Sequence, residues 1–265
     1  MKEATSLPIS ESAGDRAWDR SLANLRWQNL VMGILHAIQG VIVLTLANDF
    51  TLPITASFLE GPPGSQTGDP VRIADLSVAW GVAMFLFLSA FFHLLICSPP
   101  FFPRYGTGLA RGHNYFRWVE YSVSSSLMIV LIAMLTGITD VAALIALFGV
   151  NAAMIFFGAV QEKYEKPGGS LLPFWLGCVA GAVPWIAIGV YLVTPGSSAE
   201  PPGFVYAIFI SLFVFFNIFA VNMWLQYRQV GGWSNYLRGE RVFVLLSLVA
   251  KSALAWQVFG GTLAV

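Results

Sequence analysis

The sequence contains few charged residues. Only 11% of its 265 residues are Asp, Glu, Lys or Arg, and 57% are hydrophobic, whereas soluble domains have about 25% charged residues. Most of the chain is therefore expected to lie in lipid. The formal net charge is zero, so the composition gives no reason to expect a nucleic acid or another polyanion as a partner.

Cysteine is also scarce, and no signal peptide is evident. Cys97 and Cys178 lie in or at the end of apolar runs without metal-binding or redox spacing, which favours packing roles over a disulfide. The N-terminal residues MKEATSLPISESAGDRAWDR lack the apolar core and cleavage site of a signal peptide. We interpret residues 1–24 as a cytoplasmic tail and residues 25–265 as the transmembrane domain.

Long apolar runs are abundant. Seven of them reach the length of about 20 residues that a helix needs to cross a bilayer, and they lack the alternating pattern of an outer-membrane barrel. The expected fold is an all-α membrane protein, a bundle of seven transmembrane helices. The expected spans are 26–47, 75–97, 115–136, 140–161, 172–194, 203–227 and 238–262.

The positions of the cations predict the orientation, because Lys and Arg are retained on the cytoplasmic side. Arg72 lies on the side opposite the N-terminus and Lys251 lies inside a span, whereas all other Lys and Arg fall on the N-terminal side. We expect a multi-pass protein of the cell membrane, with its N-terminus cytoplasmic and its C-terminus extracellular. The long outer loop 48–74 contains the turn sequence GPPGSQTGDP and predicts either a short β-hairpin or an ordered loop.

Two ionisable side chains of opposite charge fall deep within the spans. Lys251 lies ten residues beyond Arg241, roughly 15 Å into the membrane at about 1.5 Å per residue, and Glu120 lies at similar depth. Such groups are costly in a bilayer unless they are paired. One interpretation is a structural ion pair between the third and seventh helices. The other is that Lys251 condenses with an aldehyde to form a Schiff base, with Glu120 as the counterion of the protonated imine.

Further polar side chains lie at the same depth. Ser247 precedes Lys251 by one turn and Ser124 follows Glu120 by one turn, so each shares a helix face with its charged neighbour. Two histidines on adjacent helices favour a proton-accepting or water-holding pocket, and no Cys, Asp or third histidine joins them to form a metal site. The polar residues expected around this pocket are His36, His93, Ser89 and Asn151.

Aromatic residues are dense in the later helices, where some are expected to line a slot for a flat polyene. They are Trp175, Trp185, Phe213, Phe215, Phe216, Phe219 and Trp256. Glu120 is the only carboxylate expected at depth, whereas a light-driven proton pump needs carboxylates on both sides of the imine. The sequence therefore argues against pumping. An intramembrane enzyme is not favoured either, because no second catalytic group is evident.

Several segments resemble the heliorhodopsins, a family of microbial rhodopsins with inverted membrane orientation. The resemblance covers nearly the whole chain after about residue 22 and includes the GPPG loop. At the position one turn before the lysine, where ordinary microbial rhodopsins usually have a second carboxylate, this chain has Ser247. The segments are RWVEYSVSSSLMIVLIA (117–133), FGVNAAMI (148–155), LLPFW (171–175), WSNYLRGER (233–241) and SLVAKSALAWQ (247–257).

The resemblance implies all-trans retinal bound covalently to Lys251, with Glu120 as the sole carboxylate counterion. Ser247 and Ser124 would border the Schiff base, and His36, His93, Ser89 and Asn151 would form a hydrated network on its cytoplasmic side. The retinal pocket would consist of Tyr121, Met128, Met154, Trp175, Trp185, Phe216 and Trp256.

The function implied by the resemblance is light sensing with a slow photocycle. Family members are retinal photoreceptors that generally pump no ions and form dimers with the outer loop near the contact. We therefore expect a homodimer in the lipid bilayer that signals to a cytoplasmic partner. The alternative is a light-gated or light-driven transporter of ions such as protons.

Overall fold

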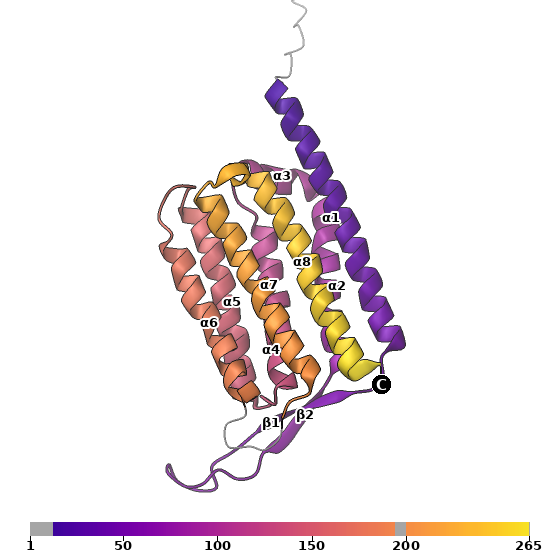
Figure 1. Ribbon diagram of the computed structural model, residues 1–265, viewed down its shortest axis with the longest axis vertical. Helices are drawn as coiled ribbons and strands as arrows, with labels where there is room; N and C mark the ends of the chain where they lie inside the picture. Colours follow the sequence, from indigo (N-terminus) through magenta and orange to yellow (C-terminus); the bar gives the residue numbers. More distant parts are fainter. Residues whose placement is uncertain (1–12, 194–199, 265) are drawn as a thin grey trace, which may run out of the picture.

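The computed structural model describes residues 13–193 and 200–264, which form a helical bundle with a small sheet at one end (Figure 1). Short 3-10 and π segments, Gly231–Ser234 and Phe259–Leu263, flank the last helix. The helices are α1 (Ala13–Leu46), α2 (Val78–Cys97), α3 (Phe102–Ala110), α4 (Tyr115–Leu135), α5 (Val141–Tyr164), α6 (Leu172–Val193), α7 (Gly203–Tyr227) and α8 (Tyr236–Val258), and the strands are β1 (Thr51–Ala56) and β2 (Val71–Ser77).

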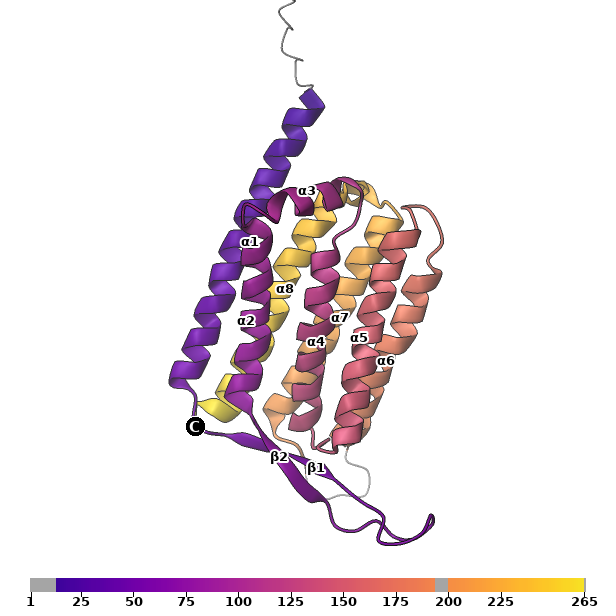
Figure 2. The same ribbon diagram turned by 180° about the vertical axis from the view of Figure 1, so that it is seen from behind.

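Within the described residues, seven helices are long and apolar enough to span a membrane, which confirms the predicted seven-helix fold. The short helix α3 was not predicted; it lies across the end of the bundle from which α1 projects (Figures 1 and 2). The first helix begins at Ala13 and not near residue 26. Its early turns are polar, and a hydropathy criterion cannot detect a helix that extends into water. The expected boundary at residue 24 thus falls inside α1.

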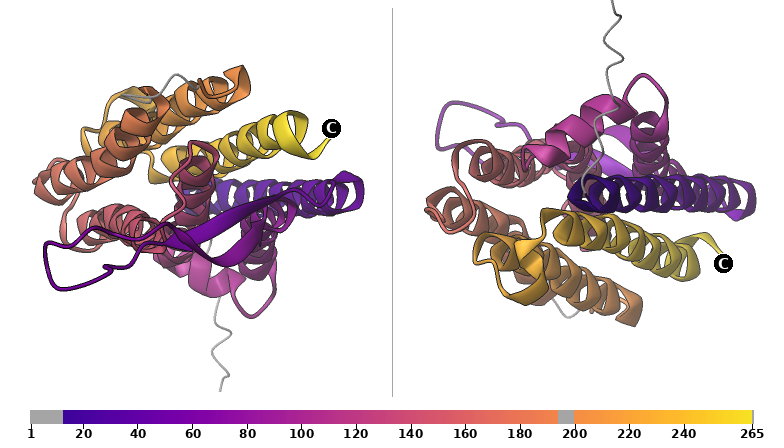
Figure 3. Two further views of the ribbon diagram at one scale, coloured as in Figure 1. Left: turned by 90° about the horizontal axis from the view of Figure 1, so that it is seen from below. Right: turned by 90° about the horizontal axis from the view of Figure 1, so that it is seen from above.

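The helices pack in sequence order around a closed ring. α1 packs on α2, α2 on α4, α4 on α5, α5 on α6, α6 on α7 and α7 on α8, and the contact of α8 with α1 closes the ring. In the end-on views of Figure 3, α8 lies beside α1 and the remaining helices extend away from this pair. Because α4 and α8 also lie across the ring from each other, their inward-facing side chains can meet in the interior.

Polar residues just before several helices fix where these helices begin. The Asp140 carboxylate accepts hydrogen bonds from the backbone N–H groups of Ala142 and Ala143 at the start of α5. The Asn114 side chain does the same for Arg117 N at the start of α4, and Asn235 for Leu237 N at the start of α8. Such caps satisfy backbone donors that have no partner within the helix.

The loop between α1 and α2 contains the predicted hairpin. β1 and β2 pair antiparallel, from Thr51 opposite Ser77 to Ala56 opposite Val71, with an irregularity between Ile54 and Thr55. Thr55 N donates to Thr139 O over 2.9 Å, and the two threonine hydroxyls lie 3.0 Å apart. The hairpin is thereby attached to the turn between α4 and α5, at the end of the bundle opposite α3 (Figure 2).

Candidate functional site

The two ionisable residues predicted at depth form a buried pair. Lys251 Nζ, on α8, donates to Glu120 Oε1, on α4, over 2.8 Å, and to Ser247 Oγ over 2.9 Å. The side chains of Lys251 and Glu120 are only 4% and 6% exposed. Ser247 lies one turn before Lys251 on the same face of α8, so the serine contact follows from helix geometry.

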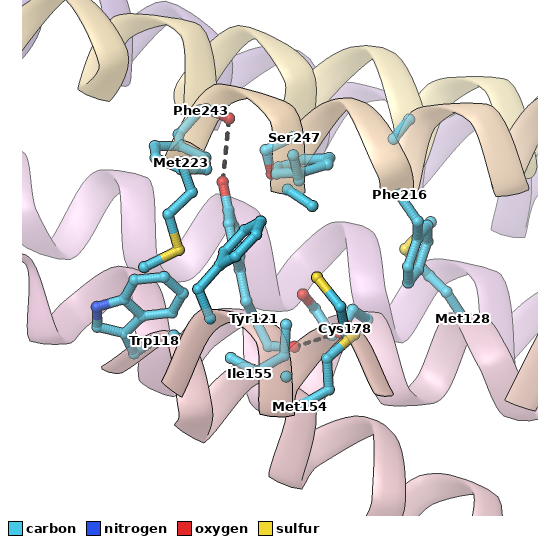
Figure 4. Close-up of a pocket in the computed structure, with 18 of the residues that line it drawn as sticks. Trp118, Tyr121, Met128, Met154, Ile155, Cys178, Phe216, Met223, Phe243 and Ser247 are labelled. Carbon is cyan, nitrogen blue, oxygen red and sulfur yellow. Dashed lines mark hydrogen bonds between the residues drawn. The ribbon is translucent and has the colours of Figure 1, made fainter. Parts of the chain in front are cut away.

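Two further side chains surround the pair. Ser89 Oγ, on α2, donates to Glu120 Oε1 over 2.6 Å, so this oxygen accepts from both a hydroxyl and an amine. The ring of Tyr121 faces Lys251 Nζ at 5.1 Å, which adds a favourable cation–π contact. The Tyr121 hydroxyl donates to Phe243 O on α8 over 3.0 Å, a contact drawn in Figure 4. Three helices thus hold the charged pair in place.

An apolar cavity of about 140 Å³ extends from Lys251 between α4, α5, α6, α7 and α8 (Figure 4). The Oγ of Ser124, also in its wall, is buried and has no hydrogen-bond partner among the described residues. The cavity is lined by the predicted Tyr121, Ser124, Met128, Met154, Phe216, Phe219 and Ser247, and by Trp118, Ser125, Ile155, Gly158, Phe174, Gly177, Cys178, Ala220, Met223, Phe243 and Ala250, which were not predicted.

Of the three predicted tryptophans, the structure places only Trp185 next to the cavity. Trp185 is buried and packs against Phe216, with 5.4 Å between ring centroids. Trp175 is 54% exposed, because on α6 it is the preceding residue, Phe174, that faces the cavity. Trp256 is 40% exposed, and its indole N–H donates to Gln39 Oε1 on α1 over 3.0 Å. Trp175 and Trp256 are therefore not wall residues of this cavity.

The two histidines lie together between α1 and α2. Their rings stack with centroids 5.7 Å apart, and His93 Nδ1 lies 2.7 Å from Asn29 Oδ1. Neither ring nitrogen of His36, which is fully buried, has a hydrogen-bond partner among the described residues. A buried imidazole without protein partners is the kind of group that internal water satisfies.

Asn151 does not reach this histidine pair. Its Nδ2 donates to Ser125 Oγ over 2.8 Å and to Ser126 Oγ over 3.0 Å, at the contact of α5 with α4. The histidines lie on α1 and α2, and of these two helices α2 packs against α4. The expectation that Asn151 joins a network with His36 and His93 is thus not met by its hydrogen bonds.

A second buried ionic cluster was not anticipated from the sequence. The guanidinium of Arg117, on α4, forms ion pairs with both Glu162 on α5 and Glu240 on α8. All three side chains are at most 4% exposed. The sequence had indicated that Glu120 is the only carboxylate at depth. The structure shows that Glu162 and Glu240 are buried as well. The signal was present in the spacing, because Glu240, Ser247 and Lys251 recur on one face of α8.

Hydrogen-bond donors surround the two carboxylates of this cluster. Asn114 donates its Nδ2 to Glu240 Oε1 over 2.6 Å and its backbone N–H to Glu162 Oε2 over 2.8 Å. The Trp118 indole N–H also donates to Glu162 Oε2, over 2.5 Å. The hydroxyls of Tyr236 and Tyr105 donate to Glu162 and Glu240 over 2.8 and 3.4 Å. With every carboxylate oxygen accepting, the geometry suits two ionised glutamates around one arginine.

Tyr105 connects the short helix α3 to this cluster. Burial raises the pKa of its phenol well above the usual value, and the nearby Glu240 raises it further, whereas a hydrogen bond with Asn29 acts in the opposite direction. The hydroxyl therefore keeps its proton. Since Asn29 also contacts His93, polar side chains extend from the histidine pair to Glu240.

The fold and this site define a seven-helix membrane protein with a buried lysine–carboxylate pair at one end of an apolar cavity. The family model described as Heliorhodopsin matches residues 25–263, and the chain belongs to the heliorhodopsin family. Heliorhodopsins are light-sensing proteins of the microbial rhodopsin class, which uses retinal as its chromophore. None of the curated proteins compared with the chain is similar enough to count as a match.

The residues present fit a retinal group. The cavity wall is almost entirely apolar, as a polyene requires, and Lys251 provides the amine at one end. The unpartnered hydroxyl of Ser124 lies in the same wall, where a polar end of a bound group would meet it.

Proposed function

We propose that the chain is a light-sensing retinal protein, with all-trans retinal bound to Lys251 as a Schiff base and Glu120 as the counterion. We further propose a slow photocycle that serves signalling and not pumping. The observation that carries the proposal is the buried 2.8 Å contact between Lys251 Nζ and Glu120 Oε1 at the end of the apolar cavity. Without the adjoining cavity, the same contact would be only a structural ion pair.

The protein's own residues would hold and release one proton. Retinal would supply the light-driven change of shape and the conjugated imine at the Lys251 nitrogen. Glu120 stabilises the cationic form of that nitrogen in the dark, and Ser247 and Ser89 orient the two charges. Separating Lys251 from Glu120 would remove this stabilisation and favour loss of the nitrogen proton.

The cytoplasmic end of α8 is well placed to pass this change to a signalling partner. Trp233 Nε1 donates to Asn222 Oδ1 over 2.8 Å, and Asn222 Nδ2 donates to Gly239 O over 3.0 Å. The segment 233–241 is therefore attached both to α7 and to the helix that contains Lys251. A shift of α8 would change the surface of this segment.

The lysine is tested by replacing it with alanine. Lys251→Ala should show no visible absorbance after addition of retinal, because no other amine contacts the cavity among the described residues. Lys163→Ala, at an exposed lysine on α5, should remain coloured and lose its colour with hydroxylamine. A coloured Lys251→Ala protein without added amine contradicts the proposal.

The counterion is tested by removing its charge and keeping its shape. Glu120→Gln should shift the visible absorption strongly to the red, because the carboxylate stabilises the charge at the nitrogen more in the ground state than in the excited state. Glu60→Gln, in the exposed hairpin turn, is the matched control and should leave the spectrum unchanged. An unshifted spectrum of Glu120→Gln would remove Glu120 from this role.

Light-driven ion transport is the second candidate, because the buried Glu162 and Glu240 add carboxylates beyond Glu120. Illumination of proteoliposomes distinguishes the two functions. A sensor should give no sustained change of external pH, whereas a sustained change that an uncoupler abolishes would favour transport.

We also propose a homodimer in the membrane, with the N-terminus cytoplasmic. Cross-linking in native membranes, followed by measurement of the mass of the product, tests the dimer. A product with the mass of one chain under conditions that cross-link a known membrane dimer contradicts it.

A further inference from the structure

A small cavity with both polar and apolar side chains in its wall lies between the Lys251–Glu120 pair and the second ionic cluster. Its volume is about 30 Å³, and its wall includes Glu120, Arg117 and Glu240, together with Asn29 and His93. A buried water needs about 10–15 Å³ and two to four polar partners. The cavity thus has room and partners for water between the two ionic groups.

The hydrogen bonds of Arg117 support a hydrated connection. The Nη1 and Nη2 atoms bind Glu240 and Glu162, but Nε is buried and has no partner among the described residues. Leaving a charged donor unsatisfied is costly, whereas water in the adjoining cavity would satisfy it. Because Arg117 lies one turn before Glu120 on α4, this donor lies close to the counterion.

The charges of the cluster are not balanced. Glu162 and Glu240 share the single positive charge of Arg117, so the two carboxylates and the arginine together have one excess negative charge. An excess charge in a buried site is unfavourable, and binding of one proton would neutralise it.

We propose that Glu240 receives the proton released from the Lys251 nitrogen after illumination, by way of Glu120 and water in this cavity. The inference rests on the proposed function, since it requires a protonated imine at Lys251. The N–H bond at Lys251 breaks and an O–H bond forms at Glu240. The cationic nitrogen becomes neutral, the carboxylate becomes a neutral acid, and the reverse transfer restores the dark state.

Glu240 is favoured over its neighbours by position. It lines the cavity together with Glu120, whereas Glu162 does not. Its partner Tyr105 has a hydroxyl that can rotate and accept from the new acid, whereas Arg117 and Asn114 Nδ2 can only donate. Once Glu240 is neutral, the charge of Arg117 balances that of Glu162. The ionisable groups around Glu240 are His93 on α2, Tyr105 on α3, Arg117, Glu120 and Tyr121 on α4, Glu162 on α5 and Tyr236 on α8.

The test is infrared difference spectroscopy on the purified pigment, recorded while the visible spectrum indicates a deprotonated imine. The wild type should gain a carboxylic acid C=O band that shifts in D₂O, and Glu240→Gln should lose it. Glu162→Gln is the matched control, because it removes the other carboxylate of the cluster and should retain the band. Loss of the band in Glu162→Gln or in Glu120→Gln, with retention in Glu240→Gln, overturns the assignment.

Two further measurements extend the test, and the first keeps it decisive if Glu240→Gln folds poorly. Tyr105→Phe leaves the Glu240 carboxylate in place but removes the hydroxyl that can accept a hydrogen bond from the protonated acid. The C=O band of the acid should therefore shift to higher wavenumber. An unshifted band counts against Glu240. In the retinal-free protein, the spectrum of wild type minus Glu240→Gln should contain carboxylate bands and no acid band. An acid band there would mean that Glu240 is already protonated and cannot receive a proton.

The two proposals fail in different ways. If the wild-type protein forms no visible pigment with retinal, the proposed function is wrong. If the pigment forms and its imine deprotonates but the acid band does not depend on Glu240, only the present inference is wrong.

Discussion

At the scale of single residues, two ion pairs connect α4 and α8. α4 contributes Arg117 and Glu120, α8 contributes Glu240 and Lys251, and each cation pairs with the acid of the other helix. An ion pair excluded from water adds little net stability, but breaking it by removing one partner is strongly destabilising. The arginine should therefore be the most sensitive residue of the second ionic cluster.

Replacement of Arg117 by methionine should lower the free energy of unfolding by about 3–5 kcal/mol, because two buried carboxylates then lose the cation that pairs with both of them. The measurement is detergent-induced unfolding of the purified protein. Arg104→Met, on the exposed face of α3, is the control and should change stability by less than about 0.5 kcal/mol. Equal stability of the two variants would show that the cluster is hydrated or already neutral.

The sequence predicts the central pair well and the second cluster poorly, for a physical reason. Lys251 and Glu120 lie within apolar runs, where a charge has no alternative to a protein partner. Arg117, Glu162 and Glu240 lie near helix ends, where a charge normally reaches water. Their burial results from α3, Tyr105 and Asn114 covering them, and these tertiary contacts cannot be deduced from hydropathy.

At the scale of elements, α5 approaches α4 closely at one glycine. A Cβ added at Gly158 would lie 2.5 Å from the ring of Trp118, whose indole N–H holds Glu162. At Gly149, on the same helix, an added Cβ meets nothing within 4 Å. Small residues permit helices to pack closely, and of these two glycines only Gly158 has that role.

Gly158→Ala should destabilise the protein by about 1–3 kcal/mol and displace Trp118, because the added methyl group overpacks the contact. Gly149→Ala should be neutral or stabilise by up to about 1 kcal/mol, because alanine favours the helix and has free space. Unfolding in detergent compares the two variants. A Gly158→Ala protein as stable as Gly149→Ala would contradict the close contact.

Element boundaries follow from the sequence where a lipid boundary or a cap fixes them. Asp140 and Asn114 mark the starts of α5 and α4 as capping residues do. The start of α1 and the whole of α3 lie outside the apolar runs, so length and hydropathy give no signal for them. Helix α3 is stabilised on its buried face, where Tyr105 and Leu109 pack in a hydrophobic cluster with residues of neighbouring helices.

At the scale of the whole molecule, the two ends of the bundle differ in charge. Exposed arginines lie at the end that carries α3, among them Arg104 and Arg111. At the opposite end the hairpin has Arg72, which pairs with Asp75. The positive-inside rule therefore predicts that α3 lies in the cytoplasm and the hairpin outside the cell.

This orientation is tested by labelling single cysteines with a membrane-impermeant maleimide in a protein whose Cys97 and Cys178 are replaced by alanine. Gln66→Cys, in the exposed hairpin turn, should react in intact cells, and Arg104→Cys should react only after the cells are permeabilised. The cysteine-free parent is the control for background reaction. The reverse pattern would place Glu240 and the segment 233–241 at the outer surface, where no cytoplasmic partner could reach them. The direction of labelling thus decides whether movement of α8 can be sensed inside the cell.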